Sequence, residues 1–396
     1  MKLIEINGQF YDMSSPTNEE FRKRIIEAFE ETQPEPSEIV STYWYHIEGF
    51  ELHLQSHLDV DFDVEFYDST GELIHRSVLR NGMFCKLSRK YYKGINYKVY
   101  LNNNLVKEET ISYKNKRVFI SFDSSSIGDT LAWLPYCDQL RVEGECEVLV
   151  STFMNDLFKE KYKSLTFLER GEVANNIHFM FKFGWFYDSE KEPEHPVTIP
   201  LQKVATNILG LEFREVRPIL DFTPHERPLT EKYVTICTSA TSGCKVWNNP
   251  NGWQELIDYL NSKGYKVAVI QKESISGLNN FLDWTGDFPL KQRMNEIYHS
   301  EFFIGLGSGI SWLAWALDKP VVMISNFSEE GHEFMDKTIR IKNESVCHGC
   351  WNNPSVKFDK GDWYWCPFHK GTDRQFECHK TITSQMVINQ IQSLLQ

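Results

Sequence analysis

Residues 117–140 read RVFISFDSSSIGDTLAWLPYCDQL, and this stretch decides the fold class. It begins with an apolar run over 117–122, continues through a turn of small residues, and ends in an amphipathic stretch, TLAWLPYCDQL. A buried strand that leads through a small-residue turn into a helix is typical of the opening of a parallel α/β unit. The sequence therefore predicts an α/β protein.

The same pattern recurs further along the chain. Buried-strand candidates follow at 147–151 and 177–183. Beyond a proline-rich crossing come the apolar runs YVTIC, KVAVIQ, FFIGL and PVVMIS, which alternate with helical stretches such as NGWQELIDYLNSKG. We therefore expect two α/β halves with a boundary near residues 222–231.

The N-terminal stretch differs from this pattern. Residues 18–32, NEEFRKRIIEAFEET, place apolar side chains at helical spacing and predict one amphipathic helix. From about residue 43 to 113, short aromatic and β-branched runs such as FDVEFYD and INYKVYL are separated by turn clusters, which predicts a small all-β module. We expect a β-rich accessory domain over 1–115, a first α/β half over 116–227 and a second over 228–396.

Composition and charge narrow the class of protein. The chain has 396 residues, of which 41% are hydrophobic and 24% charged, so it can bury a sizeable core. Its formal net charge is −13, and a phosphate polymer or an anionic membrane surface would be repelled on average. No apolar run reaches the roughly 18 residues of a membrane helix, and the N-terminus lacks the layout of a signal peptide. We expect a cytoplasmic protein of two or three domains without a nucleic-acid partner.

The turn over 124–130 is the first candidate site. Small residues between a strand and a helix allow backbone N–H groups and hydroxyls to face a ligand at the positive end of the helix. Asp129 lies in the first turn of that helix, where an acidic residue is also an ordinary cap. On the pattern alone, the capping interpretation is favoured over a functional one. The sequence contains neither a dinucleotide-binding glycine fingerprint nor a Walker lysine motif.

Two loops in the second half repeat this logic. Residues 238–243, TSATSG, follow the strand YVTIC and precede Lys245, and a hydroxyl-rich loop with one cation suits a diphosphate. Residues 308–311, SGIS, follow FFIGL and open a helix whose N–H groups can meet an anion. Either loop alone could be an ordinary join between a strand and a helix. Together with the Asp129 turn they favour a nucleotide-diphosphate site.

Four of the nine cysteines crowd into the segment 345–380, with the spacing Cys-x2-Cys-x15-Cys-x11-Cys: Cys347, Cys350, Cys366 and Cys378. Four thiolates can close a tetrahedral site around zinc or a single iron, and such a site would order this loop without an open position for catalysis. The cysteines could instead be reduced and buried, or one could be replaced as a ligand by a neighbouring histidine. Those histidines are His348, His369 and His379.

Three segments carry a resemblance to a known family: FDSSSIGDTLAWLP, TSATSGCKVWNNPNGW and FFIGLGSGISWLAWALDKPVVMI. They resemble the glycosyltransferase family 9 heptosyltransferases, which have a GT-B fold of two Rossmann-like domains. The β-rich front, with NGMFCKLSRKYY, and the cysteine-rich tail make the chain similar to the bacterial autotransporter O-heptosyltransferases over nearly its whole length. Those enzymes transfer heptose from ADP-heptose to serines of autotransporter adhesins and carry an iron-binding cysteine finger.

The resemblance implies roles for individual residues. The Gly-Asp of the first turn matches the family's catalytic base, which selects Asp129, and Lys245 matches the lysine that meets the phosphates of the sugar nucleotide. The four cysteines match iron ligands, so one structural iron per chain is implied, and the sequence alone leaves zinc open. Further nucleotide and substrate contacts are implied at Ser126, Thr130, Ser239, Thr241, Gln271, Ser308, Gly309, Ile310 and Ser311.

One departure from the lipopolysaccharide heptosyltransferases is visible. Those enzymes have Asp-Thr-Gly-Leu-Ser-His in the helix turn where this chain has Gly307-Ser-Gly-Ile-Ser-Trp312, so a charge is lost there. The resemblance implies an inverting protein O-glycosyltransferase with an ADP-heptose donor, an autotransporter adhesin as acceptor, no catalytic divalent metal and a higher homo-oligomer. The alternatives are a glycosyltransferase with another donor or acceptor and a non-catalytic GT-B-like scaffold.

Overall fold

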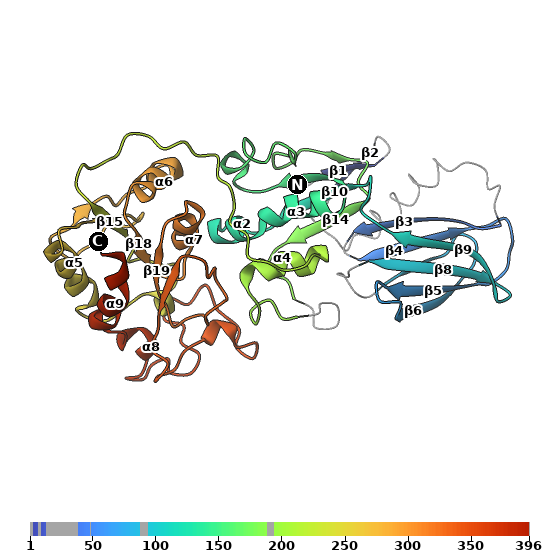
Figure 1. Cartoon of the computed structure of the whole chain (residues 1–396). Helices are drawn as coiled ribbons and strands as arrows, with labels where there is room; N and C mark the ends of the chain where they lie inside the picture. The colour runs from blue at the N-terminus through green and yellow to red at the C-terminus, as the bar shows by residue number, and fades with distance from the viewer. Residues whose placement is uncertain are drawn as a thin grey trace. The chain divides into compact units, whose positions relative to one another are not determined.

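The computed structural model of the chain describes residues 3–6, 9–12, 39–47, 49–87, 94–187 and 194–395 (Figure 1). The helix predicted over 18–32 lies outside the described residues. The chain forms two compact units: the first contains Met1–Ser125, Trp133–Glu194 and Lys203–Arg214, and the second contains Ser126–Ala132, His195–Gln202 and Glu215–Gln396. Asp129 therefore groups with the second unit and not with the strand that precedes it in the chain.

The first unit is built on a seven-stranded sheet in the order β12-β11-β10-β14-β3-β4-β7. Its central strands are parallel, as the apolar run over 117–122 predicts. β10 (Arg117–Phe122) pairs with β11 (Glu147–Ser151) on one side and with β14 (Phe179–Phe183) on the other. The edge strand β12 (Thr166–Phe167) pairs with β11. The chain also forms helices α2 (Ile127–Trp133), α3 (Pro135–Glu143) and α4 (Leu201–Leu209).

Three strands from the N-terminal stretch extend this sheet. β3 (Ser41–Ile47) pairs parallel with β14, and β4 (Phe50–Gln55) and β7 (Phe84–Lys86) follow in antiparallel pairing. The stretch expected to form an accessory domain over 1–115 thus shares a sheet with the first α/β half. The boundaries at 115/116 and 227/228 stay predictions, but hydrogen bonding is continuous across the first of them.

The remaining N-terminal strands confirm the predicted β-rich region. They form a four-stranded antiparallel sheet in the order β6-β5-β8-β9. Apolar and polar residues alternate in the strand FDVEFYD, and alternate side chains of a strand point to opposite faces of a sheet. Phe62, Val64 and Phe66 are accordingly fully buried on one face, while Asp63 is exposed. The strands are β5 (Phe62–Asp68), β6 (Leu73–Leu79), β8 (Ile95–Leu101) and β9 (Asn104–Ile111), and a small separate sheet joins β13 (Ala174–Asn175), β1 (Leu3–Ile6) and β2 (Gln9–Asp12).

The second unit contains a six-stranded, all-parallel sheet in the order β17-β16-β15-β18-β19-β20. Its inner strands are buried at nearly every position, which confirms the prediction from the four continuous apolar runs, because strands covered on both faces lack polar alternation. The strands are β15 (Tyr233–Ile236), β16 (Lys266–Val269), β17 (Leu282–Asp283), β18 (Phe303–Gly305), β19 (Val321–Ile324) and β20 (Thr338–Ile341).

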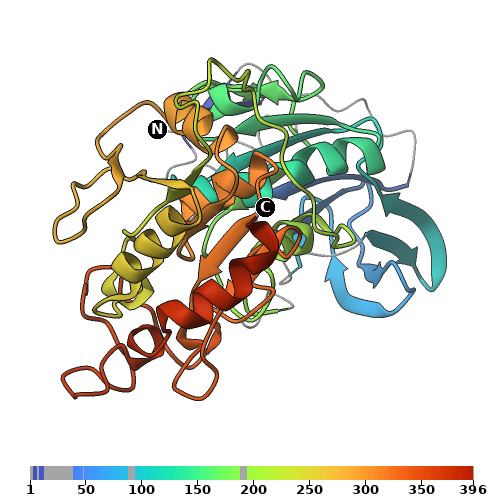
Figure 2. The ribbon, with the colours of Figure 1, turned by 60° about the vertical axis from the view of Figure 1, so that its left-hand side comes forward.

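Helices cover this second sheet. Helices α5 and α9, which are far apart in the chain, lie side by side (Figure 2). The side-chain amide of Gln392, the residue after α9, donates a 2.8 Å hydrogen bond to the hydroxyl of Tyr259 in α5. The helices are α5 (Gly252–Ser262), α6 (Leu290–Tyr298), α7 (Gly309–Ala316) and α9 (Ser384–Ile391). In the described part of the chain, no helix is both long and apolar enough to cross a membrane.

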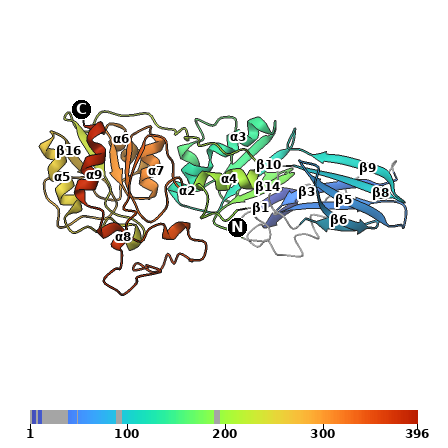
Figure 3. The same ribbon diagram turned by 60° about the horizontal axis from the view of Figure 1, so that its bottom comes forward.

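The cysteine-rich segment is mostly loop. It contains a 3₁₀ turn, Cys350–Asn352, and the short helix α8 (Glu377–Lys380), and Figure 3 shows its loops extending from the second unit beside α8. Backbone hydrogen bonds anchor it: the Gly349 N–H donates to the Asn326 carbonyl (2.8 Å) and the Gly243 N–H donates to the Trp363 carbonyl (3.1 Å). The segment therefore packs against the loop that precedes Lys245.

Candidate functional site

Asp129 lies in the first turn of α2 and is 7% exposed. The turn is closed by the Ser126 carbonyl, which accepts hydrogen bonds from the Thr130 N–H (3.1 Å) and the Thr130 hydroxyl (2.9 Å). Thr130 is fully buried, whereas Ser126 is exposed. Thr130 thus stabilises the turn in which Asp129 sits, and a substrate contact for Thr130 or Ser126 stays a prediction.

The start of α2 lies directly against the start of α7. A Cβ added at Gly309 would overlap the Ile127 side chain, and one added at Gly128 would lie 3.2 Å from the Trp312 ring. Only two glycines facing each other allow the backbones to approach this closely. Asp129, one residue further along, is therefore positioned beside the first turn of α7.

The turn before α7 has the properties of an anion site. Ser308 is the N-cap residue, but its hydroxyl makes no cap hydrogen bond, and this buried oxygen has no partner among the described residues. The first N–H groups of a helix also lack intrahelical acceptors and carry partial positive charge. Ser311 is different, because its hydroxyl donates to the Leu306 carbonyl at 2.6 Å and so holds the turn to the end of β18. Ser308, Gly309 and Ile310 are thus the members of the predicted turn with donors available to an anion.

Lys245 follows β15 in a short 3₁₀ turn, Gly243–Lys245. Its ammonium lies 5.0 Å from the Phe327 ring centre and 5.7 Å from that of Phe358, so it is held by aromatic faces. Burial lowers the pKa of Lys245, and the neighbouring Cys244, Glu333 and Asp129 oppose that shift. A cation in such a partly desolvated position interacts strongly with an anionic ligand. The structure thus brings Lys245 and Asp129 into one electrostatic environment.

The other predicted contacts of the second half surround the loop after β15. The Gln271 side-chain oxygen accepts hydrogen bonds from the Thr238 N–H (3.0 Å) and hydroxyl (2.9 Å), so Gln271 braces this loop. The Ser239 hydroxyl donates to Glu273 at 3.2 Å, and Thr241 is exposed. Their roles toward a nucleotide stay predictions.

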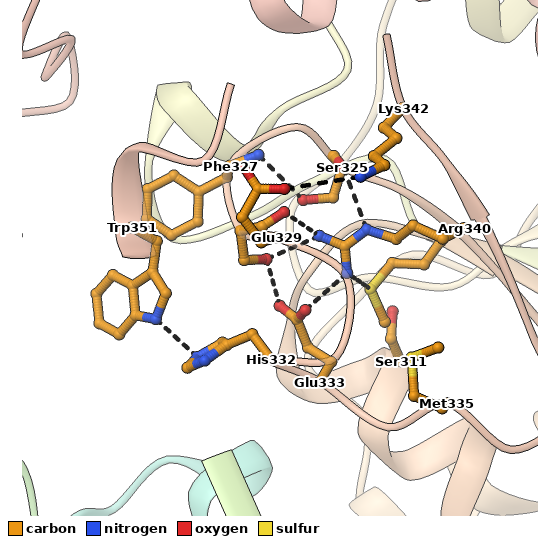
Figure 4. Close-up of polar contacts among 12 residues, drawn as sticks. Ser311, Ser325, Phe327, Glu329, His332, Glu333, Met335, Arg340, Lys342 and Trp351 are labelled. Carbon is orange, nitrogen blue, oxygen red and sulfur yellow. Dashed lines mark hydrogen bonds and ion pairs between the residues drawn. The ribbon is translucent and has the colours of Figure 1, made fainter. Parts of the chain in front are cut away.

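The loop after β19 contains a buried polar cluster that was not predicted from the sequence (Figure 4). The Arg340 guanidinium pairs with Glu333 at 2.6 Å and donates to the Ser328 carbonyl at 2.6 Å, while the Ser328 hydroxyl donates to Glu333 at 2.7 Å. Burial would raise the pKa of Glu333, but Arg340, His332 and Ser328 lower it to about 2. The sequence did offer a signal for this loop, because ligands of parallel α/β sheets bind at the carboxyl ends of strands and the polar stretch NFSEEGHEF follows PVVMIS directly.

His332 belongs to the same loop and links it to the cysteine-rich segment. The Trp351 indole N–H donates to His332 Nε2 at 2.6 Å (Figure 4). His332 Nδ1 lies 2.9 Å from the Ile199 carbonyl. A ring that accepts at Nε2 and donates at Nδ1 is neutral. Burial accordingly lowers the pKa of His332.

The cysteine-rich segment supplies one of the two aromatic rings beside Lys245, that of Phe358. A buried cluster joins Cys244 and Phe327 to Trp365, Cys366 and Phe376, with Phe358 packed against it. Two of the three neighbouring histidines lie near carboxylates: His348 is 3.6 Å from Glu329, and His369 is 3.7 Å from Glu377. The third, His379, is buried and accepts a hydrogen bond from the Asn326 N–H at 3.1 Å. The expected finger thus forms one wall of the candidate site.

The four thiols of this segment lie near one another without forming a cage. All four are free, and burial together with the neighbouring thiols raises the pKa of Cys350 and raises that of Cys378 to about 12. In the described residues, however, no three His, Cys, Asp or Glu side chains come together as a metal site. The donor set suits iron, but the predicted metal finger is not shown by this arrangement.

Comparisons with known proteins agree with this architecture. A model of glycosyltransferase family 9 (heptosyltransferase) matches residues 201–362. The autotransporter heptosyltransferase Aah of Escherichia coli is 36% identical over 301 residues, covering 72% of this chain and 76% of Aah. TibC of Escherichia coli O78:H11 is 36% identical over 322 residues, covering 78% and 79%. A more distant relative, BimC of Burkholderia thailandensis, is an inactive autotransporter heptosyltransferase with 28% identity, covering 78% and 75%.

Solved structures extend the similarity to the fold. The crystal structure of the iron-containing dodecameric glycosyltransferase TibC matches with a TM-score of 0.81 and 32% identity, covering 92% of this chain and 97% of TibC. TibC in complex with ADP-D-β-D-heptose matches with a TM-score of 0.79, covering 92% and 98%. This confirms the expected α/β glycosyltransferase fold. The chain belongs to the autotransporter heptosyltransferases of glycosyltransferase family 9.

Proposed function

We propose that the chain transfers heptose from ADP-heptose to serine hydroxyls of an autotransporter adhesin, with inversion at the anomeric carbon. One observation carries the proposal: buried Asp129 lies beside the donor-rich turn of Ser308 to Ile310, in the same unit as Lys245. A carboxylate next to an anion site is what transfer from a nucleotide diphosphate to a hydroxyl requires. The complex of TibC with ADP-D-β-D-heptose supports the choice of donor.

Asp129 acts as the general base in this proposal. The serine oxygen attacks the anomeric carbon while its proton passes to the Asp129 carboxylate. The bond between that carbon and the diphosphate oxygen breaks, and ADP leaves with the bonding electron pair. A single displacement of this kind inverts the anomeric centre, and a positioned base contributes about 10² to 10⁴-fold to the rate.

The leaving diphosphate is stabilised by groups that are in place before the reaction. The Lys245 ammonium supplies a full positive charge, and the Ser308 hydroxyl and the N–H groups at the start of α7 supply hydrogen bonds. Donors fixed in advance stabilise developing negative charge without reorganisation during the reaction. No divalent metal has a role in this scheme.

We also propose that Cys347, Cys350, Cys366 and Cys378 hold one structural iron, with zinc as the alternative. The iron-containing structure of TibC and the four neighbouring thiols support this. A bound ion would tie together the loop that packs on Lys245. No step of the transfer involves it.

Two properties follow from the relatives and the thiols. Because TibC is dodecameric, we propose that this chain forms a homo-oligomer. We place it in the bacterial cytoplasm, because the five cysteines outside the proposed iron site are free thiols, and free thiols persist in a reducing compartment.

The experiment that tests the function is intact-mass analysis of an adhesin passenger domain incubated with the purified chain and ADP-D-β-D-heptose. We expect increments of one or more heptose units on serines. Increments with a different ADP-sugar but not with ADP-heptose would assign another donor. An unmodified acceptor with every donor, combined with retained ADP binding, would favour the non-catalytic alternative that the inactive relative BimC represents.

A further inference from the structure

The first unit contains a cavity of about 350 Å³, and every residue that lines it belongs to that unit. Its walls come from β3, β8, β14, the segment between β9 and β10, and the ends of α3 and α4. The volume lies within the range of small-molecule sites, which is about 300 to 1,000 Å³. None of the residues assigned to heptose transfer lines the cavity, so any ligand of it is a second ligand.

Four aromatic rings in contact with one another line this cavity: His46, Tyr113, Phe179 and Phe181. The ring centres of Tyr113 and Phe179 are 4.6 Å apart, and those of His46 and Phe181 are 5.0 Å apart. Phe179 and Phe181 are each 4% exposed and stack on each other, with ring centres 6.3 Å apart. Aromatic rings offer a large apolar area and attract a cation that lies over their faces.

Two helices point their carboxyl ends at the same cavity. Helix α3 ends at Glu143 and α4 at Leu209, and both residues line the cavity together with the glycines that follow them. The Tyr113 hydroxyl donates to the Leu209 carbonyl at 3.0 Å, which fixes the end of α4 beside the aromatic rings. The last turn of a helix carries partial negative charge on its carbonyl groups. The two helix ends therefore favour a cation over an anion.

The charged side chains of the lining add to this preference. They are Lys114, Glu143 and Glu145, so negative charge exceeds positive charge by one. The Lys114 ammonium pairs with Glu145 at 2.7 Å. Glu143 accepts a 2.9 Å hydrogen bond from the Gln139 amide and lies 3.8 Å from Arg214, which is mostly exposed and outside the lining. Glu143 is thus the carboxylate of the lining that is best placed to meet a positively charged ligand.

We propose that this cavity binds a small organic cation, an ammonium group carried on an apolar body. The body packs on the rings of Tyr113, Phe179 and Phe181, and the ammonium group lies toward Glu143 and the carboxyl ends of α3 and α4. A nucleotide sugar does not fit this description, because its diphosphate would be repelled. The proposal does not depend on the proposed function, since the binding of a cation can be measured without heptose transfer.

The test compares three probes that carry the same phenyl ring: 2-phenylethylamine, 2-phenylethanol and 3-phenylpropanoate. Each is titrated into the wild-type chain at pH 7 in the presence of saturating ADP, which occupies the nucleotide site, and ligand-observed NMR gives the affinities. We expect the amine to bind at least about tenfold more tightly than the alcohol, as for one gained charge-assisted hydrogen bond, and the carboxylate to bind most weakly. Equal affinities, or no binding of the amine, would overturn the proposal.

Glu143→Gln removes the charge and keeps the shape of the side chain. We expect it to reduce the preference for the amine over the alcohol about tenfold, while the affinity for the alcohol stays within about twofold. Asp138→Asn is the matched control, because Asp138 is also on α3, pairs with Arg141 and does not line the cavity. An equal loss of preference in both variants would show that only the overall charge matters and would contradict the proposal.

Ile208→Phe tests whether the probes occupy this cavity. Ile208 lies near the end of α4, lines the cavity and is 4% exposed, so a larger side chain there takes up part of the space. We expect the amine and the alcohol both to bind at least about tenfold more weakly, as for a steric clash with a filled pocket. The melting temperature checks that the variant is folded. Unchanged affinities in the folded variant would place the probes elsewhere and reject the site.

Discussion

Each of the two units contains parallel strands, but the first has a cavity at the amino ends of these strands, whereas the second gathers charged and polar side chains beyond their carboxyl ends. The first unit has a cavity of about 350 Å³ lined by Tyr113 and Lys114, which precede β10, by Phe179, which begins β14, and by Gly144 and Gly210, which follow α3 and α4. These positions lie at the amino ends of the parallel strands. In the second unit, Lys245, Ser308 and Glu333 all follow the carboxyl ends of strands.

This difference indicates which unit carries the proposed transfer site. Ligands of parallel α/β sheets bind outside the carboxyl ends of the strands, where loops and helix N-termini converge. The second unit meets that condition and also includes Asp129, through Ser126–Ala132. The first unit extends its sheet with β3, β4 and β7 and adds an antiparallel sheet. The proposed chemistry therefore belongs to the second unit.

The largest effect is expected from Asp129→Asn. Removing the base should lower the rate of heptose transfer by at least about two orders of magnitude, because proton transfer in the transition state is lost. ADP affinity and melting temperature should stay close to those of the wild type. Asp138→Asn, which removes an Arg141-paired carboxylate of the first unit, is the control and should retain full activity. A normal rate in Asp129→Asn would remove this residue from the mechanism.

Lys245→Met should give the next largest effect. We expect ADP and ADP-heptose to bind about 10- to 100-fold more weakly, as for the loss of one charge-assisted hydrogen bond. Because burial disfavours the charge of Lys245, the melting temperature should hold or rise. Calorimetric titration with Lys263→Met as the surface control measures the first effect. Unchanged affinity for both ligands would show that Lys245 does not contact the phosphates.

The variants Cys350→Ser and Cys366→Ser test whether the cysteine-rich segment beside Lys245 holds a metal ion. Elemental analysis should find about one iron per wild-type chain and none in either variant, and loss of the ion should lower the melting temperature. Cys146→Ser in the first unit should keep its metal. Wild-type protein that contains neither iron nor zinc and whose four thiols are all alkylated in the native state would reject the site.

The smallest expected effect is on how the free energy of unfolding depends on pH. Since burial holds the pKa of His332 below its usual 6.5, the unfolded chain binds a proton that the folded chain does not. The stabilisation is complete above about pH 6.5 and is lost progressively as the pH falls below it. The free energy of unfolding of His332→Gln should therefore depend less steeply on pH below 6.5 than that of the wild type. Identical slopes in denaturant titrations from pH 7 to pH 5 would contradict this.

Much of the second unit was predictable, because buried parallel strands appear as continuous apolar runs and each run is followed by its functional loop. The same pattern pointed to the turns that carry Asp129 and Lys245, but it favoured a capping role for Asp129, and the resemblance to the family selected both residues. The pairing of β3 with β14 could not be predicted, because it joins segments far apart in the chain. The alternation of residues in β3 is equally typical of an antiparallel strand. Glu333 could not be predicted either, since its position depends on Gly307 and Arg340 from two other segments.

Hydrogen–deuterium exchange with and without ADP-D-β-D-heptose tests the assignment of the chemistry to the second unit most directly. We predict that the ligand slows exchange in residues 126–132, 238–246, 307–313 and 325–333, all in the second unit. Exchange in β5, β6, β8 and β9 and around the cavity of the first unit should not change. Protection confined to that cavity or those strands, with none at 238–246 or 307–313, would contradict the account.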